Sequence, residues 1–263
     1  LYSDGVLAPV DLISRAIEMG VGTLAITDHD TLDAYRDLSL STAGLQLVSG
    51  IELSTQWQTT GIHVLGLNVD LQSDAMSTAV SSQSSARLAR ARQIGERLEK
   101  KGISDAFAGA GKFSSGAYIG RPHFARYLVE IGKVDSINAA FKKYMGDGKA
   151  GDVKQHWADL SQVIQWIRDA NGIAVLAHPL KYKLTRTRLK RLLEVFIGLG
   201  GQGMEVVSGQ QLPQQTSEMA SLCESSQLLA SCGSDFHMPG KRWAELGHFS
   251  ALPGSVTPVW DHF

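Results

Sequence analysis

The chain has 263 residues, of which 43% are hydrophobic and 19% are charged, with 27 glycines but only 7 prolines. This composition excludes a disordered, collagenous or coiled-coil protein. At roughly 150 residues per domain, the length predicts one large domain or one domain with an insertion. Lysine and arginine together number 25 against 26 acidic residues, so the net charge of -1 implies no nucleic-acid or membrane partner by itself.

The two cysteines, Cys223 and Cys232, lie in apolar surroundings, which favours buried reduced thiols over a disulfide framework or a zinc site. No uninterrupted apolar stretch approaches the roughly 18 residues of a membrane-spanning helix. The amino terminus also lacks the charged and then apolar pattern of a signal peptide. We therefore expect a cytoplasmic protein with no membrane partner and no obligate protein partner.

Short aliphatic and β-branched runs, typical of buried strands, alternate with segments of helical spacing along most of the chain. Strands that alternate with helices indicate an α/β fold, with a parallel sheet or barrel and helices outside it. In chain order we predict a helix at 9–19, strands at 22–27, 45–50 and 62–67, a helix at 160–170, a strand at 173–177, a helix at 187–199, a strand at 204–208, a helix at 213–226 and a strand at 228–233.

Residues 76–152 contain no strand run, and helical patterns at 84–101, 122–131 and 136–144 predict a helical insertion domain. The barrel domain then comprises residues 1–75 and 153–263, and the serine-rich stretch 77–85 is expected to be the linker. Residues 85–154 carry 14 basic and 7 acidic side chains, whereas the remainder carries 11 and 19. This basic character fits either a polyanion-binding surface or ordinary solvated helices.

Residue types that bind metal ions lie at the ends of the predicted strands. In barrels of alternating strands and helices, the carboxyl ends of the strands form the catalytic face, so side chains that are distant in sequence can converge there. The residues at these positions are Asp28, His29 and Asp30 after the strand at 22–27, Glu52 after 45–50, His63 just inside 62–67, His178 after 173–177, and Asp235 and His237 after 228–233.

Imidazole and carboxylate groups together suit zinc, manganese or iron, and a carboxylate can bridge two ions in sites that cleave phosphate esters. Taken singly, each residue also has a structural explanation, since Asp28 or Asp30 could cap the following helix. Their combination favours a hydrolytic metal cluster. The chain has no CxxC pair, P-loop or GxSxG elbow, so it lacks the usual motifs of zinc-finger, nucleotide-kinase and serine-hydrolase proteins.

Six motifs distributed over nearly the whole chain resemble those of the PHP (polymerase and histidinol phosphatase) family of metal-dependent phosphoesterases. Within this family the segment from Gly120 to Arg126 and the position of the helical insertion are similar to one branch in particular. Its members trim RNA from the 5′ end and remove the 3′-phosphate of 3′,5′-bisphosphonucleotides. The six motifs are Ser3-Asp4-Gly5, Ala25-Ile26-Thr27-Asp28-His29-Asp30, Gly50-Ile51-Glu52-Leu53-Ser54, Ile62-His63-Val64-Leu65-Gly66, Ala177-His178-Pro179 and Gly233-Ser234-Asp235-Phe236-His237.

The resemblance implies a distorted (β/α)7 PHP barrel with a helical insertion domain and up to three divalent metal ions, with manganese expected and zinc or iron as alternatives. It implies attack on phosphorus by a metal-bound hydroxide. Glu52, His63, His178, Asp235 and His237 are the residues expected to carry catalysis. As metal ligands, it assigns Glu52 as the bridging carboxylate, His63 and His178 to one of the ions that Glu52 shares, Asp235 to the other, and Asp4, His29 and His237 to the third.

One element of the family pattern is missing. The family's His-x-His motif should precede Tyr2, but the sequence begins at Leu1 with no methionine. We expect that the natural protein extends further upstream. If it does not, the ion at Asp235 would lack half of its usual protein ligands.

Substrate binding requires cations besides the metals. Arg121 and His123, at the start of a predicted helix, and Lys149 are candidates for binding a second phosphate. An exposed basic patch is the structural alternative for these three residues. Six further cations lie between Lys181 and Arg191, where they could guide RNA or cover a solvated helix face.

The predicted substrate is a nucleotide or a short 5′-phosphorylated RNA. Two alternatives stay open: another PHP phosphoesterase, histidinol-phosphatase-like or DNA-directed, and a catalytically impaired binding module. The absent His-x-His motif is the only feature that favours the impaired module.

Overall fold

The computed structural model describes residues 2–36, 38, 44–114, 119–146, 148–153 and 157–263. It divides into two compact units. The helical unit comprises Leu1–Asp4 and Ser81–Trp157, and the sheet unit comprises Gly5–Val80 and Ala158–Phe263. Each unit has its own apolar core, built from buried side chains of its own elements.

The sheet unit contains two sheets among its described residues. β1 (Thr23–Ala25) and β2 (Gln46–Val48) form a parallel pair, and the larger sheet has the order β3-β4-β5-β6-β7. A parallel bridge between His29 and Glu52 joins the exit of β1 to β3. The strands of the larger sheet are β3 (Gly50–Trp57), β4 (Thr60–Leu67), β5 (Ile173–Leu176), β6 (Gly203–Ser208) and β7 (Leu229–Gly233).

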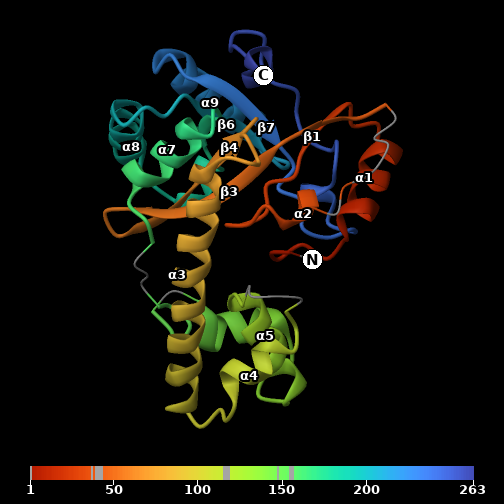
Figure 1. Cartoon of the computed structure of the whole chain (residues 1–263), viewed down its shortest axis with the longest axis vertical. Coiled ribbons are helices and arrows are strands. Elements are labelled where there is room, and N and C mark those ends of the chain that lie inside the picture. Colours follow the sequence, from red (N-terminus) through yellow and green to blue (C-terminus); the bar gives the residue numbers. More distant parts are fainter. Residues whose placement is uncertain (1, 37, 39–43, 115–118, 147, 154–156) are drawn as a thin grey trace. The chain divides into compact units, whose positions relative to one another are not determined.

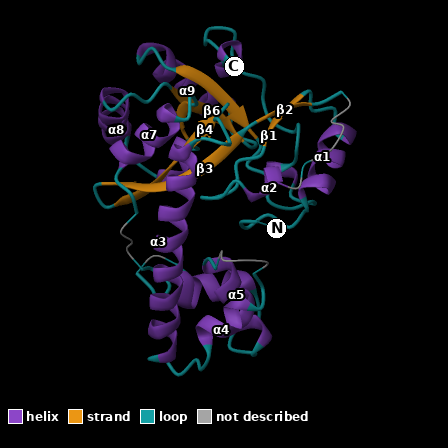
Figure 2. Ribbon diagram, viewed as in Figure 1, coloured by secondary structure: helices purple, strands orange, loops and turns teal. Residues whose placement is uncertain are grey.

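Three helices cover one face of the larger sheet, as Figures 1 and 2 show: α7 (Leu160–Asp169), α8 (Arg186–Gly198) and α9 (Pro213–Ser225). Their apolar residues, such as Val163, Leu192 and Ala220, pack with Leu176 and Val206 of the strands in one core. Each of these helices, like α1 (Pro9–Glu18), ends within one residue of its predicted position. The α/β barrel class predicted from the sequence is therefore confirmed.

The hairpin of β3 and β4 departs from the expected all-parallel order. Thr60 pairs with Trp57, so only Gln58 and Thr59 connect the two strands, and Gln58 adopts a positive φ of 55°. A two-residue turn can join only antiparallel strands, and β4 is also antiparallel to β5. The prediction of parallel strands was wrong here because β3 itself was not predicted. Its polar residues Glu52 and Ser54 interrupt the apolar run, yet both are buried.

The helical unit consists of α4 (Ala106–Gly111), α5 (Arg121–Glu130), α6 (Ile137–Ala140), a π-helical turn at Phe141–Met145, and most of α3 (Asp74–Glu99). Phe124, Leu128 and Ile94 are fully buried in its core. Gly109 permits α4 and α5 to approach closely, since a Cβ atom there would lie 2.2 Å from the Tyr127 ring.

The serine-rich stretch predicted as a linker is helical, because α3 runs continuously from Asp74 to Glu99. Serine tolerates helical backbone moderately well, and here tertiary packing adds support. Met76 and Ala79, in the first turns of α3, are completely buried in the core of the sheet unit. The Ser85 hydroxyl donates a hydrogen bond to the Ser81 carbonyl oxygen one turn earlier.

Two further expectations concern the cysteines and the membrane. Cys223 and Cys232 are free cysteines, the first buried and the second half-buried, and burial raises the pKa of each thiol to about 12. Among the described residues, every helix is too short or too polar to cross a lipid bilayer.

Candidate functional site

Four predicted metal ligands converge in the sheet unit: His29, Glu52, His63 and His178. His29 follows β1, and its bridge to Glu52 aligns the exit of β1 with the first residues of β3. His178 follows β5, whereas His63 lies near the start of β4. Since β4 runs antiparallel to β5, its amino end meets the carboxyl end of β5, where the Ala177 N–H donates to the His63 carbonyl at 3.1 Å.

Glu52 is at the centre of this cluster. Its Oε1 atom lies 2.8 Å from Nδ1 of His63 and 2.9 Å from Nε2 of His178. Its Oε2 atom lies 3.5 Å from Nδ1 of His29. The His63 Nδ1 and His178 Nε2 atoms are themselves only 3.3 Å apart. One carboxylate thus faces three imidazole rings within a buried space.

The electrostatics of the cluster favour the protonation states that metal ions require. Burial opposes ionisation of Glu52, but the neighbouring His29, His63 and His178 outweigh it and hold the pKa of Glu52 well below its usual range. Burial lowers the pKa of His63, and Glu52 offsets this only in part. An ionised carboxylate beside a neutral imidazole is the ligand combination of transition-metal sites.

The residues present fit a bound metal ion. The Nδ1 atom of His29, which faces Glu52, is buried and makes no hydrogen bond, although buried polar atoms are nearly always paired. His29, Glu52 and His63 each offer a ligand atom, and these atoms lie within 4.8 Å of one another. A divalent cation between them would satisfy nitrogen and oxygen lone pairs that otherwise face each other.

Two residues that the sequence analysis did not select, Glu205 and Tyr182, hold the cluster in place. The Glu205 carboxylate, buried in β6, accepts the His178 backbone N–H at 2.6 Å. The Tyr182 hydroxyl oxygen accepts the His63 N–H at 3.0 Å, and the hydroxyl donates to the Ala177 carbonyl at 2.6 Å. Glu205 had one signal in the sequence, since it is a single charge within an otherwise apolar strand.

Asp30, which follows β1 and is buried, ties the exit of β1 to β3. Its carboxylate accepts the Ser54 backbone N–H at 2.7 Å and the Ser54 hydroxyl at 2.9 Å. Ser54 pairs with His63 in the hairpin register. Asp30 therefore fixes the strand segment that carries Glu52.

Asp235 and His237 form a neighbouring group at the carboxyl end of β7. The His237 ring nitrogen Nδ1 lies 2.8 Å from the Asp235 carbonyl oxygen, and the Asp235 carboxylate forms an ion pair with Lys181. Lys181 was considered in the sequence only as part of a basic run. Its ammonium group contacts the same carboxylate that is predicted to bind a metal ion.

The remaining predicted residues, Asp4, Arg121, His123 and Lys149, belong to the helical unit. His123 is buried at the start of α5, where its Nδ1 accepts the Gly120 N–H at 2.9 Å. Burial and the Arg126 charge lower the pKa of His123, although Asp4 opposes them. Arg121 donates a hydrogen bond to the Met145 carbonyl at 3.4 Å, and Lys149 is exposed.

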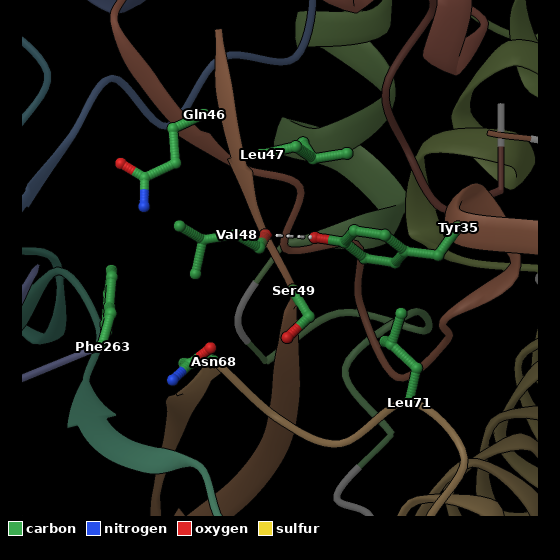
Figure 3. A pocket seen from close by; sticks show the side chains of 8 residues that line it. All are labelled: Tyr35, Gln46, Leu47, Val48, Ser49, Asn68, Leu71 and Phe263. Carbon is green, nitrogen blue, oxygen red and sulfur yellow. Dashed lines mark hydrogen bonds between the residues drawn. The ribbon is translucent and has the colours of Figure 1, made fainter. Parts of the chain in front are cut away.

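A separate pocket of about 410 Å³ in the sheet unit is lined by Tyr35, Val48, Asn68 and Phe263 among others (Figure 3). The Tyr35 hydroxyl donates to the Val48 carbonyl at 2.9 Å on its wall. Among the described residues, the side chains that line it carry no imidazole, carboxylate or thiol group, so they do not have the chemistry of a metal site.

Comparisons with known proteins find relatives that match nearly the whole chain. No family model matches the chain. The chain is 43% identical to a 5′-3′ exoribonuclease of Haemophilus influenzae, covering 99% of this chain and 95% of that protein. It is 45% identical to the 5′-3′ exoribonuclease Rnm of Escherichia coli, and the match covers 98% of this chain and 89% of that protein. It is also 38% identical to a 3′,5′-nucleoside bisphosphate phosphatase of Chromobacterium violaceum, covering 98% and 92%.

Two solved structures share the fold over almost its full length. An amidohydrolase structure from Chromobacterium violaceum, with bound sulfate and no metal, has a TM-score of 0.90 at 38% identity and covers 99% of this chain and 92% of that one. A structure from Bifidobacterium adolescentis, described as a metal-dependent phosphoesterase, has a TM-score of 0.79 at 25% identity and covers 98% and 90%. Together with the histidine and carboxylate cluster at the strand ends, these similarities show that the chain belongs to the PHP family of metal-dependent phosphoesterases.

Proposed function

We propose that this protein removes the 3′-phosphate of 3′,5′-bisphosphonucleotides and trims 5′-phosphorylated RNA from its 5′ end. The observation that carries the proposal is the convergence of Glu52 with His29, His63 and His178. It occurs in a chain similar over nearly its whole length to relatives named for these two activities. Both reactions hydrolyse a phosphate ester of a nucleotide, so one site can serve both.

We further propose that up to three divalent ions, with manganese preferred, bind at this face. Such ions, when bound, act as Lewis acids on the ester and lower the pKa of water. Glu52, His63 and His178 would hold one ion, and Glu52 and Asp235 would hold a second. His29 and His237 would hold the third.

The protein's own residues keep this site ready for an anionic substrate. Glu205 and Tyr182 bind the backbone N–H groups of His178 and His63, so both rings keep their direction toward Glu52. Low exposure of Glu52 and His178 limits water around the ligands, which strengthens electrostatic interactions there. Lys181 places a positive charge beside Asp235, where a phosphate oxygen could replace the carboxylate as its partner.

We propose that the helical insertion, residues 76–152, forms a separate domain that supplies further phosphate-binding groups. Arg121, His123 and Lys149 would contact the second phosphate of a bisphosphorylated substrate. Arg121 and His123 begin α5, and the first turn of a helix favours anions.

Release of inorganic phosphate from adenosine 3′,5′-bisphosphate in the presence of Mn²⁺ tests the reaction. Histidinol phosphate serves as the comparison substrate, and a 5′-phosphorylated oligoribonucleotide tests trimming. We expect turnover of the nucleotide and the RNA but not of histidinol phosphate. Glu52→Gln should lower activity by more than about 100-fold. Loss of a residue that only supports a metal ligand costs at most about 100-fold, so a larger loss indicates a ligand.

Arg121→Ala separates substrate binding from chemistry. The variant should raise KM for adenosine 3′,5′-bisphosphate, whereas Arg92→Ala, an exposed cation on α3, should not. An Arg121→Ala variant with unchanged affinity for the bisphosphate would exclude Arg121 from substrate binding. Preferential hydrolysis of histidinol phosphate by the wild-type protein would overturn the nucleotide specificity.

A further inference from the structure

Trp243 is unusually exposed for a large aromatic side chain. It is 61% exposed, and among the large hydrophobic residues in the described part of the chain only Leu212, at 67%, is more exposed. Both belong to connections at one edge of the sheet, since Leu212 follows β6 and Trp243 follows β7. A single exposed aromatic ring is not by itself a binding surface, so its backbone support and the charges beside it decide whether it can bind a ligand.

The backbone that carries Trp243 is held firmly. The Trp243 carbonyl oxygen accepts the Gln210 N–H at 2.7 Å, and a Cβ atom at Gly209 would lie only 2.7 Å from that oxygen. Two residues later, Glu245 is buried and accepts two hydrogen bonds from Arg15, at 3.0 and 2.7 Å. The indole ring is therefore presented to solvent by an ordered backbone, which reduces the entropy lost when a partner binds.

Trp243 belongs to the connection at the carboxyl end of β7, where Asp235 and His237 also lie. β7 runs directly into Ser234 and Asp235, and the Gly209 N–H donates to the Gly233 carbonyl at 2.8 Å. Gly209, which contacts Trp243, also lies close to the carbonyl oxygen of Ser234, where a Cβ would be 3.3 Å away. The Trp243 segment is thus packed against the backbone that leads into the Asp235 and His237 group.

The charges around the ring favour a polyanion. Lys241 and Arg242 immediately precede Trp243, and the Ala244 N–H donates to the Lys241 carbonyl at 3.0 Å, which places all three in one 3₁₀ turn. Arg242 is exposed. The nearest acidic side chain in sequence, Glu245, is neutralised by Arg15. An exposed aromatic ring with adjacent cations is the combination that binds single-stranded nucleic acid, through base stacking and phosphate contacts.

We propose that Trp243 stacks on a nucleobase of single-stranded RNA, beyond the nucleotide being hydrolysed, while Lys241 and Arg242 contact the RNA phosphates. This inference rests on the proposed function and adds to it a binding surface for the RNA that extends out of the site. It distinguishes RNA from adenosine 3′,5′-bisphosphate, whose single base belongs to the nucleotide being hydrolysed.

Trp243→Ala and Trp243→Phe test the inference, with Trp260→Ala as the matched control. Trp260 is also an exposed tryptophan in a 3₁₀ turn. Pro258, two residues before it, bridges to Ala230 near the amino end of β7, which is the opposite end of the strand from Asp235. We expect Trp243→Ala to raise KM for a 5′-phosphorylated octaribonucleotide by about 10-fold, with kcat unchanged, as loss of one stacked base predicts. Trp243→Phe should restore most of the affinity.

Trp243→Ala should hydrolyse adenosine 3′,5′-bisphosphate with unchanged kinetics. Trp260→Ala should resemble the wild type on both substrates. An octamer with one abasic position should abolish the difference between wild type and Trp243→Ala when that position is the stacked one. Wild-type protein that trims RNA while Trp243→Ala matches Trp260→Ala overturns this inference alone. Wild-type protein that hydrolyses neither substrate contradicts the proposed function itself, and failure to bind the octamer also overturns the inference.

Discussion

His178 adopts a backbone conformation of φ 27° and ψ 59°, which residues other than glycine rarely adopt. Such a conformation costs about 1–3 kcal/mol and persists only when its surroundings hold it. The 2.6 Å hydrogen bond from the His178 N–H to Glu205 is the contact that holds it here. Gly233 leaves room for this carboxylate, because a Cβ there would lie 3.2 Å from Glu205 Oε1.

Glu205 should therefore control metal binding without being a ligand. Glu205→Met preserves the shape but leaves the His178 N–H unpaired, and it should weaken Mn²⁺ binding by about 10–100-fold. Glu205→Gln retains an acceptor oxygen for the His178 N–H and should restore most of the affinity. Isothermal titration with Mn²⁺ on folded protein measures both. Equal metal affinities for the two variants would contradict this role.

At the scale of elements, the composition of α3 predicts a linker where the structure has a helix. Serines at 77, 81, 82, 84 and 85 suggest a flexible linker, yet the helix is continuous across them. Burial of Met76 and Ala79 against the strands provides stability that serine propensity alone does not. A continuous helix is stiff, whereas a serine-rich coil is flexible.

Ser82 provides a direct test because it is exposed and lies inside the helix. Ser82→Pro removes a backbone hydrogen bond and clashes with the preceding turn, so it should lower the free energy of unfolding by about 3 kcal/mol. Ser82→Ala, the matched control, should raise it by a few tenths of a kcal/mol. Urea denaturation monitored by circular dichroism measures both changes. If residue 82 lay in a flexible linker, both variants would unfold at the wild-type urea concentration.

At the scale of the whole molecule, metal binding should be coupled to stability. Glu52 and His63 lie in β3 and β4, whereas His29 and His178 follow β1 and β5, so the four ligands come from two sheets that the bridge between His29 and Glu52 joins. A ligand that binds only the folded state stabilises it by about 2.7 kcal/mol at a concentration 100 times its dissociation constant. Bound ions should therefore stabilise the folded sheet unit as well as support the reaction.

Removal of metal tests this coupling. Treatment with EDTA should abolish hydrolysis and lower the melting temperature, and saturating Mn²⁺ should raise it by about 5–10 °C. Glu52→Gln should lose the Mn²⁺-dependent shift, while His248→Gln, at an exposed histidine outside the cluster, should keep it. Differential scanning fluorimetry measures these shifts. A shift of the same size in Glu52→Gln would mean that manganese binds elsewhere.

The sequence by itself determined the features that depend on neighbouring residues. Short apolar runs followed at once by His29, His178 or Asp235 indicated both the strands and the side chains at their ends, because strand propensity and the position of a residue after a strand are local properties. The helices around the sheet followed from periodicity for the same reason. The α/β barrel and its family were therefore predictable before any contact was known.

Only the tertiary structure decided the rest. The antiparallel direction of β4, which brings His63 to His178, depends on pairing between strands more than a hundred residues apart. The bond of Glu205 to His178 and the exposure of Trp243 likewise depend on what packs beside them, which no local pattern encodes. Long-range contacts of this kind form only when the chain closes large loops, so their partners are set by the packing of the complete fold.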